Sequence, residues 1–338
     1  MSRTVILGAG IAGHTAALHL RRMVGKEHDV VVVAPNSKWN WIPSNIWVGV
    51  GQMSVKQVTF PLAPIYKRKG IEFHQALATE LHAEGSPTLP RPHVMVRYTD
   101  EDRQGVVAPL EYDYLINATG PKLNFGATPG LGPDGHTWSV CTAGHAAETA
   151  TAFEDVLVRL HAGERQTLLI GMGHGTCTCQ GAAFEYTFNV EHELVKEGVR
   201  DRAEVIYITN ESQLGDFGMD GMNFGHKGDV IPSQMFTESL FQERGVKAIM
   251  SAHVERVEPG IAYYEVVDGT KGAQPFDFAM LLPPFRGADL TAFDAADADI
   301  TSEVFAASGF MKVDADYSPK PYEEWKASDW PKTYQSVK

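Results

Sequence analysis

The three cysteines of this 338-residue chain are the side chains whose type and spacing could carry redox chemistry. Cys177 and Cys179 lie in the stretch GMGHGTCTCQGAAFEY (171–186), and Cys141 lies in SVCTAGHA (139–146). Three cysteines are too few for a disulfide framework, and their spacings fit no zinc pattern, so no metal site is expected. Each thiol is therefore either a small buried packing group or a reactive sulfur, depending on its surroundings.

Cys177 and Cys179 follow a glycine turn of the kind that binds phosphate. The apolar run TLLIG ends in Gly171, and a segment with helical periodicity follows at 181–198. A helix N-terminus stabilises negative charge, so a thiol placed there is expected to have a lowered pKa. This context favours redox chemistry for Cys179 and packing for Cys177. A Cys177–Cys179 bridge would be strained and easily reduced.

The same pattern opens the chain. An apolar run at 3–8 leads into GAGIAG, a helical pattern follows, and HDVVVVAP (28–35) is typical of a buried parallel strand. We predict dinucleotide binding here, with the diphosphate held by the residues of the turn, Gly8, Ala9, Gly10 and Gly13. The acid that usually follows the second strand is missing, so the ribose would bond to Asn36, Ser37 or the backbone, and Pro35 is counted among the cofactor-binding positions.

These repeated units predict an α/β fold with two tandem Rossmann-like dinucleotide-binding domains. The first domain is expected to span 1–125 with a return segment at 286–338, and the second, with the cysteines, 126–285. The strand that ends in Ala118, Thr119 and Gly120 is typical of the point where the chain leaves the first domain of a flavoprotein disulfide reductase.

The formal net charge of -13 argues against binding to nucleic acid or to anionic lipid. No apolar run approaches the roughly 20 residues that span a bilayer, and the first residues do not have the pattern of a signal peptide. These features predict a location on the cytoplasmic side of the membrane.

The chain resembles the sulfide:quinone oxidoreductases, a branch of the flavoprotein disulfide reductases that includes the flavoprotein subunit of flavocytochrome c sulfide dehydrogenase. The matching stretches are spread over the whole chain: VILGAGIAGHTAA, IPSNIWVGVG, YDYLINATGPKL, SVCTAGHA, CQGAAFEY and MLLPPFRG. The resemblance implies FAD as cofactor, and sulfide and quinone as substrates. It implies that Cys179 carries the sulfur bridge and that Cys141 lies beside the flavin.

The resemblance also assigns supporting residues. Glu185 and His145 correspond to a carboxylate and a histidine of the redox site, whereas Cys177 is an addition to the family pattern. The cofactor-binding positions would be completed by Ser44, Asn45, Ala78, Thr119 and Gly120, with Ala78 meeting the adenine through its backbone. The family's remaining cysteine and its membrane-binding helices are expected beyond residue 338. Peripheral attachment to the inner membrane would therefore use a segment outside this sequence, and a homo-oligomer is left open.

Spacing alone leaves several alternatives open. Glu185 lies six residues after Cys179, about 240° around an ideal helix, so the two side chains need not meet. His145 is either a proton carrier or a structural group. An NAD(P)H-dependent quinone or disulfide oxidoreductase would share the fold, although neither CxxC nor CxxxxC occurs. An incomplete flavoprotein subunit that passes electrons to a cytochrome is the third interpretation.

Overall fold

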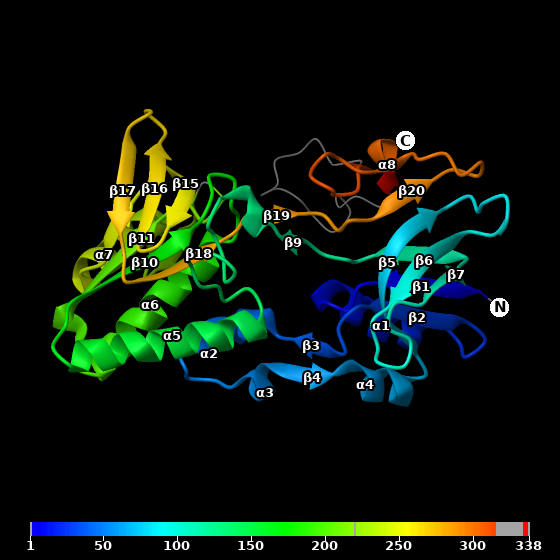
Figure 1. Ribbon diagram of the computed structural model, residues 1–338, viewed down its shortest axis with the longest axis horizontal. Helices are drawn as coiled ribbons and strands as arrows, with labels where there is room; N and C mark the ends of the chain where they lie inside the picture. The colour runs from blue at the N-terminus through cyan, green and yellow to red at the C-terminus, as the bar shows by residue number, and fades with distance from the viewer. Residues whose placement is uncertain (1, 220, 316–333, 337–338) are drawn as a thin grey trace. The chain divides into compact units, whose positions relative to one another are not determined.

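The computed structural model describes residues 2–219, 221–315 and 334–336, and the chain divides into two units (Figure 1). Unit 1 comprises Met1–Trp39, Pro61–Lys122 and Arg286–Lys338, and unit 2 comprises Asn40–Phe60 and Leu123–Phe285. The segment 40–60 thus belongs to unit 2, although the sequence pattern predicts it within the domain 1–125. Part of the expected return segment, 316–333 and 337–338, lies outside the described residues.

Unit 1 is built on a sheet with the strand order β7-β6-β5-β2-β1-β8, and β20 also pairs with β5. Strands β5, β2, β1 and β8 run parallel, whereas β6 and β7 continue the sheet in the antiparallel sense. The bounds are β1 (Arg3–Leu7), β2 (Asp29–Ala34), β5 (Glu72–His82), β6 (His93–Tyr98), β7 (Val107–Glu111), β8 (Tyr114–Asn117) and β20 (Thr291–Phe293).

The expected strand, turn and helix at the start of the chain are present. Helix α1 (Ile11–Met23) begins directly after Gly10, and α4 (Leu62–Lys69) precedes β5. The run of valines in β2 is buried on both faces, as expected for a central parallel strand. Val5 and Leu7 of β1 pack with Val31 and Val33 of β2 in the core of unit 1.

Unit 2 repeats this plan with the four-stranded order β14-β11-β10-β18, in which every pair is parallel. The bounds are β10 (Gln166–Met172), β11 (Ala203–Ile208), β14 (Lys247–Ile249) and β18 (Phe278–Leu282). The parallel strands have the same order in both units. In unit 1, β1 lies between β2 and β8, with β5 beyond β2, and in unit 2, β10 lies between β11 and β18, with β14 beyond β11. This is the arrangement of a Rossmann-type sheet.

The sheet of unit 2 is covered on both faces, as Figure 1 shows. Helices α5 (Ala143–His161) and α6 (Gln180–Lys196) lie on one face, and the antiparallel sheet β15 (Ala252–Glu258), β16 (Ile261–Val266) and β17 (Lys271–Pro275) lies on the other. Alternate residues of β10 serve the two layers: Leu168 and Ile170 pack with the helices, and Leu169 packs with β15 and β16.

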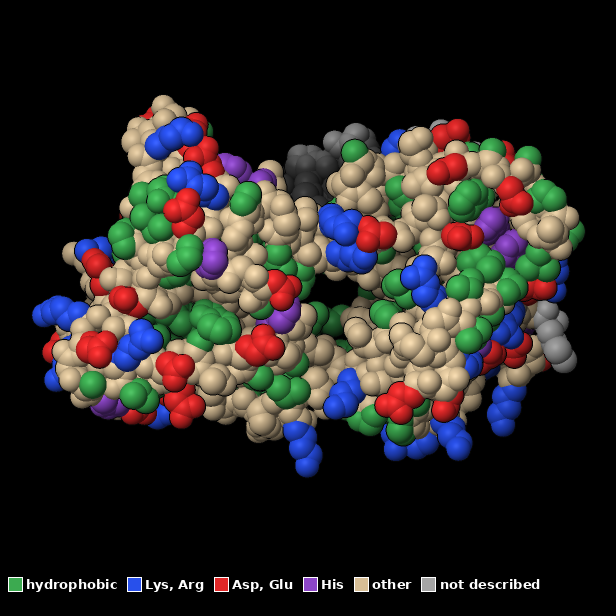
Figure 2. Space-filling model, viewed as in Figure 1, with side chains coloured by type: hydrophobic (Ala, Val, Ile, Leu, Met, Phe, Trp, Pro, Cys, Tyr) green, Lys and Arg blue, Asp and Glu red, His purple; other side chains and the backbone are tan. Residues whose placement is uncertain are grey.

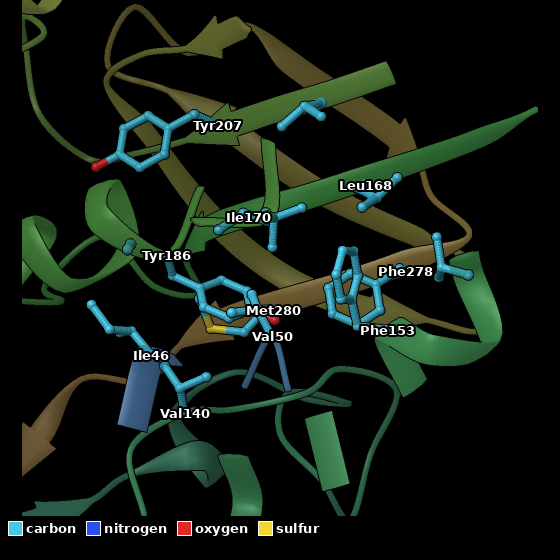
Figure 3. Packing of buried hydrophobic residues seen from close by; sticks show 14 of the residues in the cluster. Ile46, Val50, Val140, Phe153, Leu168, Ile170, Tyr186, Tyr207, Phe278 and Met280 are labelled. Atoms are coloured by element: carbon cyan, nitrogen blue, oxygen red, sulfur yellow. The ribbon is translucent and has the colours of Figure 1, made fainter. Parts of the chain in front are cut away.

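The helix-side core of unit 2 is buried and combines aliphatic with aromatic side chains (Figure 3). The rings of Phe153 and Phe278 meet edge to face with centroids 6.1 Å apart. Tyr186 of α6 is completely buried, and its hydroxyl donates to the carbonyl of Gly49 at 3.0 Å. This bond ties the segment 40–60 to α6, and the packing of Ile46 and Val50 in the same core explains why that segment belongs to unit 2.

The remaining elements are short and connect or extend these layers. In unit 2 or at the passages between the units they are β3 (Lys38–Asn40), η1 (Ile42–Ser44), α2 (Asn45–Val48), α3 (Val55–Val58), β4 (Thr59–Pro61), β9 (Lys122–Leu123), η2 (Phe125–Ala127), η3 (Arg200–Arg202), β12 (Asn223–His226), β13 (Asp229–Pro232), α7 (Ser233–Arg244) and β19 (Phe285–Arg286). In unit 1 they are α8 (Thr301–Val304), β21 (Val313–Ala315) and β22 (Tyr334–Ser336).

Acidic and basic side chains are interspersed on the face drawn in Figure 2. Within the part of the chain that the structure describes, none of the helices combines the length and the apolar character needed to cross a bilayer.

Candidate redox and cofactor sites

The glycine turn of unit 1 leaves room for a ligand at one position only. Gly8 has a φ of +99°, and a side chain there would meet the carbonyl oxygen of Ala118 at 2.0 Å, so this glycine serves the fold. A side chain on Gly10 would meet nothing within 4 Å. Helix α1 starts directly after Gly10, with no acidic residue in its first turn. Open space before an uncapped helix start fits the phosphates of a dinucleotide.

The other cofactor residues predicted in unit 1 lie mostly at the same sheet edge. Pro35 and Asn36 follow β2, and Thr119 and Gly120 follow β8. Because both strands run parallel to β1, these residues and the glycine turn meet at the carboxyl ends of the strands. Pro35, Asn36 and Gly120 are exposed, whereas Ala9 within the turn is buried.

Ala78 has a different setting, inside the long strand β5. It pairs with Val96 of β6, immediately before a register shift that separates Ala78 from Glu80. The shift is a β-bulge, which locally interrupts the regular backbone pairing. Whether this backbone binds adenine stays a prediction.

Ser44 and Asn45 belong to unit 2, not to the unit that carries the first glycine turn. Ser44 is half-buried at the end of η1. Asn45 is fully buried, and its amide exchanges two hydrogen bonds with the amide of Asn40, at 3.0 and 3.1 Å. The Asn40 oxygen also accepts the N–H of Ala143 at 3.1 Å. The Asn45 side chain is thus engaged in attaching α2 to the start of α5.

The second glycine turn differs from the first because protein groups fill it. The N–H of Gly173 donates to the carbonyl of Leu282 at 2.8 Å, and the N–H of Gly175 donates to Nδ1 of His253 at 2.7 Å. A side chain on Gly175 would lie only 2.5 Å from that nitrogen. Helix α6 begins at Gln180, so residues 173–179 form a separate segment, here called the redox loop.

Cys177 is buried inside this loop. Its side chain is 2% exposed, and its thiol donates to the carbonyl of Leu282 at 3.0 Å. Burial raises the pKa of the Cys177 thiol to about 12, against the smaller opposing effect of nearby backbone hydrogen bonds. The expected lowering of the thiol pKa at the start of this helix is therefore wrong for Cys177. The burial agrees with the packing interpretation of this residue.

Cys179 is exposed and occupies the N-cap position of α6. Its backbone is left-handed, with a φ of 78° and a ψ of 36°. This region is strained for a residue with a β-carbon, and such strain concentrates at functional positions. The loop therefore holds the Cys179 sulfur at the surface of unit 2 in a conformation that the local sequence does not favour.

Cys141 lies directly before the N-cap of the other long helix, α5. It is partly buried, and its N–H donates to the hydroxyl of Ser139 at 3.2 Å. The pKa of its thiol is raised to about 11, first by burial, against the effect of Ser139, and further by the charge of Cys179. The structure thus brings Cys141 within electrostatic range of Cys179, and Cys141 in turn raises the pKa of Cys177.

His145 and Glu185 lie in different environments. His145 lies in the first turn of α5, where its Nδ1 is buried without a hydrogen-bond partner among the described residues. Its ring meets Phe125 edge-on, with centroids 5.9 Å apart. A buried unpaired nitrogen is unusual and is suited to a ligand or a proton. Glu185 is exposed on α6.

Two residues that sequence reasoning did not select organise this region. His253 fills the glycine turn, and Glu211 is a buried carboxylate that follows β11. Glu211 accepts hydrogen bonds from Thr209 at 2.9 Å, from Tyr207 at 3.3 Å and from the N–H of Phe217 at 2.5 Å, and burial raises its pKa. The sequence shows that an acid, Glu211, follows β11, the second strand of this unit. It does not show that the carboxylate points into the core.

Glu211 anchors the backbone of Phe217, which lies in the glycine-rich segment after β11. The Phe217 ring packs edge-on against Phe184 of α6 with centroids 5.4 Å apart. Phe217 itself has a φ of 53°, so this segment shares with Cys179 a left-handed residue at the carboxyl edge of the sheet.

Two Rossmann-type units in one chain, the first with an open glycine turn, are the fold of the tandem dinucleotide-binding class of proteins. The chain belongs to the pyridine nucleotide-disulphide oxidoreductase family, whose family model matches residues 2–197. The predicted fold class is thereby confirmed, together with the resemblance to sulfide:quinone oxidoreductases, for which the following relatives are the support.

The sulfide-quinone reductase of Aquifex aeolicus is 29% identical over 288 residues, 85% of this chain and 60% of the relative. The mitochondrial sulfide:quinone oxidoreductase of Mus musculus is 24% identical over 320 residues, 92% of this chain and 61% of the relative. The crystal structure of the Aquifex aeolicus sulfide:quinone oxidoreductase matches with a TM-score of 0.76 at 27% identity, covering 94% of this chain and 66% of that one. The chain spans about three fifths of the length of these curated relatives.

Proposed function

We propose that the protein is an FAD-dependent oxidoreductase that oxidises sulfide and passes the electrons to a quinone. Sulfide and quinone are proposed as substrates because they appear in the names of the relatives to which the chain is similar. The observation that carries the proposal is the contrast between the two glycine turns. The turn in unit 1 is open, whereas the turn in unit 2 is filled by His253 and ends in the exposed thiol of Cys179.

The residues at the carboxyl edge of the unit 1 sheet fit FAD. The open space at Gly10 and the N–H groups at the start of α1 would hold the diphosphate, and Asn36, Thr119 and Gly120 lie at the same edge. When bound, FAD supplies a two-electron acceptor for the oxidation of sulfur.

Cys179 is the residue that would hold the sulfur. Its exposed sulfur can take up one sulfane sulfur atom as a persulfide, with formation of one S–S bond. Overall, hydrosulfide, quinone and one proton yield the bound sulfur atom and quinol, so that two electrons leave sulfide and reach the quinone. Further rounds would lengthen the chain to a polysulfide.

Cys141 and His145 would support this chemistry as proton-holding groups. Cys141 keeps its proton at neutral pH because its pKa is raised to about 11, so its thiol can donate a hydrogen bond to a sulfur anion. The Nδ1 of His145, buried without a hydrogen-bond partner among the described residues, offers a hydrogen-bonding position at the start of α5. The role of the exposed Glu185 stays a prediction from the resemblance.

The NAD(P)H-dependent alternative finds less support. A dinucleotide phosphate needs free backbone N–H groups, and those of Gly173 and Gly175 already donate to protein acceptors. The carboxylate that could bind its ribose, Glu211, is turned into the core of unit 2.

The first experiment is anaerobic titration of the FAD-loaded protein with sulfide and, separately, with NADH, followed at the flavin absorbance. We expect bleaching by sulfide and recovery with a short-chain quinone, and loss of the sulfide response in Cys179→Ser. The matched control is Thr178→Ser, one residue away, which should respond as the unmodified protein does. Bleaching by NADH alone would refute the proposal.

Replacing the quinone with cytochrome c in the same assay separates the remaining alternative. Recovery with cytochrome c and none with quinone would favour a flavoprotein subunit that serves a cytochrome. The peripheral position on the cytoplasmic side of the inner membrane and the homo-oligomer stay predictions.

A further inference from the structure

We propose that His253 is a positioning residue whose neutral imidazole fastens the redox loop to β15, and that acidification releases the loop. The importance of this loop for activity rests on the proposed function, because the loop carries Cys179. The fastening itself rests on geometry within unit 2 alone.

The contact between His253 and the loop is short and specific. Nδ1 of His253 accepts the N–H of Gly175 at 2.7 Å, and the imidazole occupies the space that a side chain at Gly175 would need. A ring nitrogen can accept an N–H only when it carries no proton. The bond therefore requires the tautomer with the proton on Nε2 and is incompatible with the imidazolium.

A second imidazole on the loop has the same requirement. His174 meets His253 edge-on, with ring centroids 4.5 Å apart and an interplanar angle of 79°. Its Nδ1 accepts the N–H of Thr176 at 3.1 Å. The pKa of His174 is lowered, first by burial and then by His253. No role is predicted for His174 from the sequence, whereas in the structure its ring accepts a hydrogen bond from within the loop.

The carbonyl of Gly175 is linked to the backbone of Cys177 through hydrogen bonds from a shared donor. Asn210 donates to the carbonyls of Gly175 at 2.9 Å and of Cys177 at 3.0 Å. Gln180, the first residue of α6, donates to the Cys177 carbonyl at 3.3 Å and to the Asn210 side chain at 3.2 Å. A shift of Gly175 therefore disturbs the bonds that bury Cys177 and lead into Cys179.

The charged groups around His253 set the response to pH. Glu265 of β16 pairs with His253 across the ladder and lines the same pocket. Lys271 of β17 binds Glu265 at 3.2 Å and Glu255, two residues along β15, at 3.1 Å. Both carboxylates are thus partnered, and the ring of His174 is a further titratable neighbour of His253. The imidazole of His253 lines this pocket beside Glu265.

The decisive comparison is between His253→Asn and His253→Ala. The Oδ1 of asparagine can replace Nδ1 as acceptor but takes up no proton in this range, whereas alanine offers no acceptor. The readout is the rate at which 4,4′-dithiodipyridine labels Cys177, assigned by mass spectrometry, at pH 8 and at pH 5.5. His161→Asn, a half-exposed histidine on α5, is the matched control.

At pH 8 we expect the unmodified protein and His253→Asn to label alike. His253→Ala should label about fivefold faster, the change expected from losing one hydrogen bond. At pH 5.5 the unmodified protein should label about fivefold faster than His253→Asn, and His161→Asn should follow the unmodified protein. Circular dichroism shows whether each variant is folded.

Equal rates for the unmodified protein and His253→Asn at pH 5.5 would overturn the proposal, as would a folded His253→Ala that labels slowly at pH 8. Labelling requires neither sulfide nor quinone. A failure of the proposed function would therefore appear in the flavin titration and leave this result unchanged, and a failure of the fastening would appear here alone.

Discussion

Cys141 and Cys179 stand at the starts of two long helices of unit 2, α5 and α6, and the charge of Cys179 raises the pKa of Cys141. The two residues differ in access as well as in charge. Cys179 is exposed, whereas Cys141 is partly buried and keeps its proton up to about pH 11. Solutes can therefore reach the sulfur of Cys179, whereas the thiol of Cys141 stays neutral.

The first prediction concerns this coupling. Cys179→Ala should lower the pKa of Cys141, because it removes a neighbouring negative charge, and should speed the alkylation of Cys141 at pH 9. Iodoacetamide labelling followed by mass spectrometry measures the rate. Thr178→Ala is the control and should leave the Cys141 rate unchanged. An equal or slower rate in Cys179→Ala would show that the two sulfurs are uncoupled.

The second prediction concerns stability in alkali. The pKa of Cys177 is about 12 and that of Cys141 about 11 in the folded protein, against an ordinary value of 9.0. Above pH 9 the unfolded chain loses these protons while the folded protein keeps them. The stability that the buried neutral thiols contribute is therefore complete below pH 9 and is lost as the pH rises towards 11 and 12.

Each thiol should lower the free energy of unfolding by about 1.4 kcal/mol per pH unit in this window. Urea denaturation between pH 9.5 and 10.5 measures the slope for the unmodified protein and for Cys177→Ala. The variant should show a slope smaller by about that amount. Parallel slopes would mean that Cys177 does not keep its proton on folding.

The third prediction tests the left-handed backbone of Cys179, whose φ is 78°. A β-carbon is unfavourable in this conformation, so Cys179→Gly should be more stable than Cys179→Ala by about 1 kcal/mol in urea denaturation. At Thr178, where φ is not positive, the order of the glycine and alanine variants should be reversed. The same order at both positions would argue against a strained Cys179.

The fourth prediction separates the two roles of the first glycine turn. Gly10→Ala should fold normally, because a side chain there meets nothing within 4 Å, but should bind FAD at least about tenfold more weakly, since its methyl group enters the phosphate space. Gly8→Ala should fail to fold stably, because its side chain would meet the Ala118 carbonyl at 2.0 Å.

Fluorescence titration with FAD and thermal denaturation measure the two effects. Tight FAD binding by Gly10→Ala would place the diphosphate elsewhere. A stable Gly8→Ala would contradict the close approach of the turn to the end of β8.

Much of this molecule follows from local patterns in the sequence. The valine run of β2, the apolar β10 and the glycine turns after β1 and β10 indicate parallel strands and Rossmann-type units, since burial on both faces of a sheet needs continuous apolar runs. The candidate cysteines could be selected because their positions before helical segments are also local features. The sequence pattern predicts the segment 40–60 within the first domain, because its packing against α5 and α6 is a long-range contact that no local pattern shows.

The sequence by itself determined the two glycine turns and the thiols that follow the second. Tertiary structure alone decided which turn is open, because His253 arrives from β15, 78 residues further along the chain, and no local pattern predicts where its ring lies. It also decided that Cys177 is buried, Cys179 exposed and Glu211 directed inward. Exposure and pKa depend on which distant residues exclude water from a group, and those contacts form only when the sheet and its two covering layers are assembled.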